Sequence, residues 1–276
     1  MAAAESLAGP DELADDEREA VAALLFRLAD DEFVMGDRYT DWQVRSPTLE
    51  SDLALSNIAQ DEIGHARLWY DLLEDFGHTE ADLIWTRPAD DFTHATLCEL
   101  PFDEGDWADV IVRSYLYDAA EAVRLESLIG SSYPRIRDRV EKVIDEEDYH
   151  VNHGRRWLER LVEGEDGRGR VQAALDRLYP HALTLFAPGE HEGRIDELGL
   201  RTDTLDAQRE AWAETTTRFL ESLDLAVPEA DLPDAVGRDR SHTEHWADQH
   251  AEITRAFEEL GRSEVRRIMK DPDDGE

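Results

Sequence analysis

The sequence has a single cysteine, Cys98, among its 276 residues. One cysteine cannot form an intrachain disulfide framework, and it cannot supply a cysteine zinc site or an iron–sulfur cluster held within the chain. A metal ion bound by this chain would therefore need carboxylate and imidazole ligands.

Long hydrophobic runs are also missing from the sequence. No stretch approaches the roughly 18 uncharged apolar residues of a membrane-spanning helix. The first residues include acids where a secretory signal has a basic region and an apolar region. These features predict a cytoplasmic protein with no membrane partner.

Basic residues are few. The chain has 29 Lys and Arg against 66 Asp and Glu, a formal net charge of −37, and only Lys142 and Lys270 are lysines. Nucleic acid is not an expected partner, because an acidic surface repels phosphate groups. The acids are typical of a solvated surface adapted to high salt, where screening reduces self-repulsion. Asp and Glu alone are therefore weak indicators of a functional site here.

Alternating β-branched runs, which indicate strands, are scarce, whereas apolar residues make up 41% of the chain. The pattern predicts one all-α domain over 1–270, built as a four-helix bundle with additional C-terminal helices. Residues 271–276 are predicted to form a disordered acidic tail. The two core hairpins, 11–76 and 106–164, are expected to contain helices over 11–42, 46–76, 106–129 and 133–164, with a long crossover between the hairpins and further helices over 170–187, 203–223 and 241–262.

An acid interrupts the apolar stripe of each expected core helix, when the stripe is followed at alternating steps of three and four residues. Glu32 lies on the first stripe and Asp118 on the third. The second and fourth stripes each carry a Glu-x-x-His pair. An unpaired carboxylate in a core is costly, so four acids on facing helices require a shared positive charge. The six polar residues on these stripes are Glu32, Glu62, His65, Asp118, Glu147 and His150.

A pair of metal ions supplies such a charge. One acid from each of two helices and a Glu-x-x-His from each of the other two form the di-iron carboxylate arrangement of ferritin-like bundles, with Asp118 in place of a glutamate. Glu32 and Glu62 are 30 residues apart, and Asp118 and Glu147 are 29 apart, so the two hairpins repeat one plan. The six residues are predicted to bind two iron ions, and manganese stays open because it accepts the same ligands.

Weaker signals in the sequence have simpler explanations. A single Glu-x-x-His is weak, because about one match is expected by chance in a chain so rich in glutamate. The group His242, Glu244 and His245 could form a secondary metal site, but surface pairs or a contact between subunits explain it better.

Three aromatic residues and six further acids on or beside the apolar stripes are not predicted to bind metal directly. Aromatic residues at helical spacing belong more often to the core than to a cavity beside metals; here they are Trp42, Trp69 and Tyr115. Six further acids adjoin the stripes, and we interpret them as supporting or surface groups: Asp30, Asp31, Glu121, Glu126, Asp145 and Glu146.

Phrases spread over nearly the whole chain carry a family resemblance. They are 28–32, 36–38 with Trp42, 46–47 with 49–50, 52–59, 64–67, 117–118, 146–147 with His150, 237–239, 241–242 and 244–245. In these phrases the chain resembles the phenylacetyl-CoA epoxidase subunits of phenylacetate catabolism, and the C-type subunits in particular.

The resemblance implies a ferritin-like protein that pairs with a related, catalytic A-type partner and is served by a flavin and iron–sulfur reductase. It implies O₂-dependent epoxidation of the aromatic ring of phenylacetyl-CoA. C-type subunits of this family generally lack a full ligand set and act as structural partners, whereas this chain retains all six positions.

Three functions follow from these observations. The first is a di-iron monooxygenase component, an oxidoreductase whose metals are held by the six residues. The second is a non-catalytic protein that stabilises a catalytic A-type partner. The third, iron storage or ferroxidase activity, is disfavoured by the additional helices and the family phrases. With any of these functions, the chain is expected to form a homo- or hetero-oligomer. No phosphate-binding glycine motif indicates where coenzyme A would bind.

Overall fold

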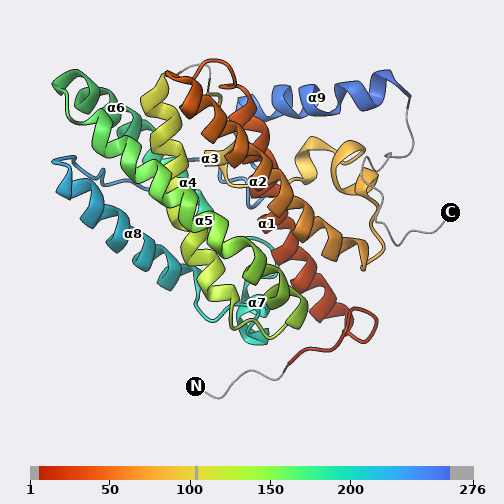
Figure 1. The fold of residues 1–276 in the computed structure, drawn as a ribbon. Coiled ribbons are helices and arrows are strands. Elements are labelled where there is room, and N and C mark those ends of the chain that lie inside the picture. The colour runs from red at the N-terminus through yellow and green to blue at the C-terminus, as the bar shows by residue number, and fades with distance from the viewer. Residues whose placement is uncertain (1–5, 103–104, 262–276) are drawn as a thin grey trace.

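Four long helices form the centre of the molecule (Figure 1). The computed structural model describes residues 6–102 and 105–261, and within these ranges it contains helices and no strand. Helix α1 pairs with α2, and α4 pairs with α5. The predicted all-α four-helix bundle with additional C-terminal helices is confirmed, with core helices that begin and end within four residues of the expected bounds: α1 (Asp15–Thr40), α2 (Leu49–Glu74), α4 (Trp107–Leu128) and α5 (Pro134–Leu161).

Local chemistry explains where the core helices begin. Thr48 caps α2, because its side chain accepts a hydrogen bond from the Ser51 amide. Asp106 caps α4 in the same way through the Ala108 amide. Pro134 is the first residue of α5, a position where its missing N–H costs nothing.

The crossover between α2 and α4 contains short helical turns and is fastened to α1 by a buried acid. Asp30 accepts hydrogen bonds from Arg87 at 2.7 Å, from the Tyr70 hydroxyl at 2.7 Å and from the Thr93 amide at 2.8 Å. Asp30 is therefore a buried anchor of the crossover. The turns are η1 (Ala81–Trp85), η2 (Ala89–Asp91) and α3 (Thr96–Glu99).

Asp31 is a second anchor, and it reaches farther along the chain. Its carboxylate pairs with Arg124 of α4 at 2.5 Å and with Arg238 at 2.6 Å, and it accepts from the Ala95 amide at 2.7 Å. One side chain thus ties α1 to α4, to the crossover and to the segment before the last described helix.

The C-terminal helices flank the bundle. Helix α8 packs on α4, where the Trp212 indole donates to the Leu116 carbonyl, and α9 lies on the opposite side against the crossover (Figure 1). Within the described ranges, none of the helices combines the length and hydropathy needed to cross a membrane. The tail predicted over 271–276 lies outside the described residues. These helices are α6 (Glu165–Ala182) running into η3 (Leu183–Phe186), α7 (Glu192–Leu198), α8 (Leu205–Ser222) and α9 (Glu244–Glu259).

Candidate metal centre

The six residues singled out on the apolar stripes meet in the middle of the bundle, and each side chain is at most 2% exposed. Their ligand atoms form two groups, and within each group the atoms lie within 4.8 Å of one another. Glu62 belongs to both groups, as a carboxylate that bridges two ions would. One group is Glu32, Glu62, His65 and Glu147, and the other is Glu62, Asp118 and His150.

The distances between these atoms suit ligands of common ions. His65 Nδ1 lies 3.1 Å from Glu147 Oε1 and 4.0 Å from Glu32 Oε2. His150 Nδ1 lies 3.5 Å from an oxygen of Glu62 and 3.5 Å from one of Glu147. Metal–ligand bonds of about 2.1 Å place the ligand atoms of one ion about 3 Å apart. The side chains would need only small movements to coordinate an ion.

The polar atoms of this cluster lack hydrogen bonds. Apart from the ion pairs between Glu147 and the two histidines, every carboxylate oxygen of the four acids and Nδ1 of both histidines is buried with no hydrogen-bond partner among the described residues. A buried polar group left without a partner costs about 1–3 kcal/mol, and more when it is charged. Two divalent cations would balance four carboxylates and give every one of these atoms a partner. The residues present therefore fit a pair of metal ions.

The electrostatics of three acids point the same way. Burial raises the pKa of Glu32, and it raises the pKa of Asp118 and Glu62 well above their usual range, with the negative charge of Glu32 adding to the effect on Glu62. Without a cation these carboxyls favour the protonated form. Protons would then occupy the positions that metal ions take, so metal binding should release protons.

Glu147 and the two histidines form a charged group instead. Burial opposes the charge on Glu147, but the nearby His150 and His65 outweigh it and hold its pKa at about 2. Burial likewise lowers the pKa of each histidine, and Glu147 outweighs it, raising the pKa of His65 to about 10 and of His150 to about 9. In the absence of metal, the two imidazolium groups compensate part of the negative charge.

A second acid supports each histidine from the facing helix. His65 Nε2 on α2 lies 2.7 Å from Glu146 Oε2 on α5, and His150 Nε2 on α5 lies 3.4 Å from Asp61 Oδ2 on α2. Such partners hold the Nε2 proton, so Nδ1 faces the cluster as an acceptor for metal. Glu146 was expected from the sequence as a supporting or surface group, whereas Asp61 was not expected as part of the site. The signal was present, because an acid precedes the glutamate in both motifs.

Two tyrosines flank the acids and were not expected as site residues. The hydroxyls of Tyr39 and Tyr117 are buried and make no hydrogen bond within the described part of the chain. Burial, followed by the negative charges of Asp118 and Glu62, raises the pKa of Tyr39, while burial and the charges of Glu32 and Glu62 raise that of Tyr117. Both phenols stay protonated beside the cluster.

The other residues considered in the sequence have separate positions. Glu121 is buried one turn after Asp118 and pairs with Arg124 at 2.6 Å. Glu126 and Asp145 are exposed. The three aromatic residues pack in or against the hydrophobic core: Trp42, Trp69 and Tyr115.

A further cluster joins the crossover to the start of α9. Glu99 Oε2 lies 2.6 Å from His94 Nε2 and 2.7 Å from His242 Nδ1, and Glu99 Oε1 accepts from the Thr243 amide. Both carboxylate oxygens are thus already satisfied, unlike those of the central cluster, and we interpret this group as a polar contact that holds the fold. Of the secondary candidates His242, Glu244 and His245, only His242 takes part.

Comparisons with known proteins extend these observations. The sequence profile of a family described as "Phenylacetic acid catabolic protein" matches residues 2–261. The chain is 32% identical over 236 residues to the C-type component of 1,2-phenylacetyl-CoA epoxidase from Escherichia coli (strain K12), covering 84% of this chain and 94% of that protein. It is 26% identical over 197 residues to the A-type component of the same epoxidase, covering 70% of this chain and 63% of that protein. The resemblance seen in the sequence phrases is confirmed.

Proposed function

The chain belongs to the phenylacetic acid catabolic protein family, and from this premise we propose that it is the di-iron component of a multicomponent phenylacetyl-CoA 1,2-epoxidase. The proposal rests on the central cluster of six buried residues, whose carboxylate oxygens and Nδ1 atoms have no hydrogen-bond partner outside the cluster among the described residues. A purely structural protein has little use for four acids buried together with only two histidines to compensate them, because uncompensated buried acids lower the stability of the fold.

Two iron ions held by the six residues would supply the binding and reductive activation of O₂. The chain itself supplies ligation, orientation and exclusion of water. Glu62 lies in both ligand groups and would connect the two ions. Glu146 and Asp61 hold the imidazole rings in position. The near-zero exposure of all six side chains would keep bulk water away from bound ions.

We propose that the electrons for this reaction come from another protein. Cys98 is the only cysteine of the chain and is fully buried, so the chain cannot hold an iron–sulfur centre of its own. A separate reductase is therefore part of the proposal. An A-type protein is a further proposed partner, because the chain is related to two different components of one epoxidase. Phenylacetyl-CoA is the proposed substrate.

Metal content tests this proposal most directly. After anaerobic reconstitution with ferrous ion, we expect two irons per native chain and a clear loss in Glu62→Ala, which removes the residue shared by both groups. Glu126→Ala is a matched control, since Glu126 is exposed on α4. Turnover of phenylacetyl-CoA with an A-type partner and a reductase should be lost in Glu62→Ala and kept in the control. A native chain that binds no iron would refute the proposal.

A second candidate, a non-catalytic scaffold for an A-type partner, is favoured by one observation. The chain is more similar to the C-type component of the epoxidase, over 94% of that protein, than to the A-type component, over 63%. The Glu62→Ala experiment described above distinguishes the two candidate functions. If Glu62→Ala loses its iron while the assembled complex keeps full activity, the scaffold function is correct.

A further inference from the structure

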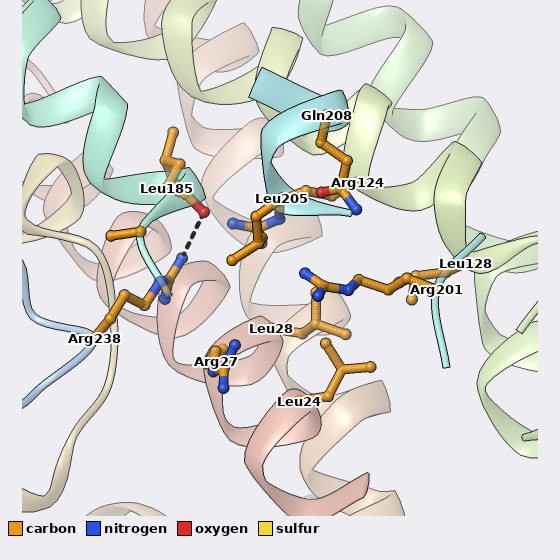
Figure 2. Close-up of a pocket in the computed structure, with 11 residues that line it drawn as sticks. Leu24, Arg27, Leu28, Arg124, Leu128, Leu185, Arg201, Leu205, Gln208 and Arg238 are labelled. Carbon is orange, nitrogen blue, oxygen red and sulfur yellow. Dashed lines mark hydrogen bonds between the residues drawn. The ribbon is translucent and has the colours of Figure 1, made fainter. Parts of the chain in front are cut away.

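Four arginines surround a small cavity away from the six proposed ligands. They come from distant parts of the chain: Arg27 on α1, Arg124 on α4, Arg201 after α7 and Arg238 before α9. Figure 2 shows their side chains reaching between leucines toward the same space, which measures about 30 Å³. Each arginine is at most 8% exposed. In a chain with only 29 basic residues and a net charge of −37, this is an unusual concentration of buried positive charge.

Two carboxylates are shared among the four guanidinium groups. Asp31 pairs with Arg124 and Arg238, and Glu192 pairs with Arg27 and Arg201. Because each acid serves two arginines, these two pairs of contacts leave two positive charges without a carboxylate of their own.

Two further acids reduce this excess by different amounts. Glu121, which is fully buried, pairs with Arg124 and compensates one charge. Asp196 pairs with Arg201 at 2.8 Å, but its side chain is 36% exposed, so solvent screens it. The four arginines thus pair with four carboxylates, but one of these acids is partly exposed, so the buried positive charge is only partly balanced by buried negative charge.

Unused hydrogen-bond donors lie in the same place. The Nε atoms of Arg124 and Arg201 are buried and have no partner among the described residues. Both side chains line the cavity. Leaving a charged donor unsatisfied inside a protein is costly, so an acceptor in the cavity within reach of these two groups would stabilise the fold.

We propose that this cavity binds one monovalent halide ion, chloride under ordinary conditions. The space exceeds the roughly 10–15 Å³ that one water requires. A halide needs few donors, whereas the four oxygens of a tetrahedral oxyanion such as sulfate would need more donors than the two unpartnered Nε groups supply. A water molecule would fit but would leave the excess positive charge uncompensated. A bound halide compensates that charge and links α1, α4 and the segments that carry Arg201 and Arg238.

Anomalous scattering from bromide tests the proposal on the native protein. In crystals of the full chain soaked in sodium bromide, data collected at the bromine edge should show a peak in the cavity, in contact with the Nε atoms of Arg124 and Arg201. A cavity that contains only water, with no anomalous peak there, would overturn the proposal.

A pair of variants tests it in solution. Gln208 lines the cavity, and its Oε1 is buried without a hydrogen-bond partner in the described ranges. Gln208→Glu would place a built-in anion beside the arginines. Gln43→Glu adds the same charge at an exposed position and serves as the control.

The readout is the melting temperature in sodium chloride compared with sodium gluconate at equal ionic strength, because gluconate is too large for the cavity. We expect the native protein and Gln43→Glu to melt about 2–4 °C higher in chloride. Gln208→Glu should lose this difference and the bromide peak. Equal melting temperatures of the native protein in the two salts would contradict the proposal.

Discussion

The histidines of the central cluster depend on acids that do not belong to it. Each Nε2 is paired with a carboxylate one residue before the glutamate of the facing helix. Each histidine is thus paired with an acid of the other hairpin. The two hairpins are therefore related by an approximate internal symmetry, which includes Glu146 and Asp61 as well as the proposed ligands. Glu146 and Asp61 can therefore be mutated while all six proposed ligands stay in place.

Asp61→Asn should weaken metal binding without abolishing it. The amide cannot accept the His150 proton as strongly as a carboxylate, so the imidazole loses both orientation and basicity. We expect iron affinity to fall about 10–100-fold, measured by competition with a chelator. Asp145→Asn is the control, because Asp145 is exposed on α5. An unchanged affinity in Asp61→Asn would mean that His150 is held by packing alone.

The six cluster residues could be predicted because they interrupt apolar stripes, and a stripe can be followed within one helix. Asp61 could not be found by the same reasoning, because it lies beside the stripe and its partner is on another helix. Glu99 was missed for a related reason. Its partners His94 and His242 are 5 and 143 residues away, and no local pattern links them.

At the level of helices, the four core helices were the easiest to predict because their apolar periodicity is long. Helix α6 begins at Glu165, five residues before the predicted start, since Gly167 and Gly169 resemble a loop in the sequence. Gly167 has a packing role instead, because a Cβ there would lie 2.0 Å from the Leu161 carbonyl oxygen at the end of α5. Helix α7 was missed because it has seven residues and buries only Ile195.

The crossover is the element whose position rests most on buried charge. Asp30→Ala should detach it from α1, because Arg87 and the Tyr70 hydroxyl would lose their shared partner. Breaking a buried ion pair from one side costs about 3–5 kcal/mol. We expect that decrease in the free energy of unfolding by chemical denaturation. Asp90→Ala, an exposed acid of the same crossover, should change the stability by less than about 0.5 kcal/mol.

At the scale of the whole molecule, the pH dependence of stability can be assigned in part to Asp31. Burial opposes its charge, but Arg238 and Arg124 outweigh it and lower the pKa from 3.8 to about 2. A carboxylate with a depressed pKa contributes stability that is complete above the pKa of the unfolded chain and is lost as the pH falls through the folded value.

Comparison with Asp31→Asn isolates this contribution from the other buried acids. The native protein should exceed the variant in unfolding free energy at pH 6, and the part due to ionisation, on the order of 2 kcal/mol, should disappear between about pH 4 and pH 2. Denaturant titrations of both proteins across this range provide the measurement. A difference that does not change with pH would show that Asp31 acts through packing rather than charge.

The division of the two ligand groups between the hairpins affects when the proposed centre can form. Each group takes residues from both hairpins: His65 and Glu32 meet Glu147, while Asp118 and His150 meet Glu62. Neither hairpin by itself contains a complete coordination sphere. Under the proposed function, the complete two-ion centre forms only after both hairpins have been synthesised and have packed together, so full loading with iron follows folding.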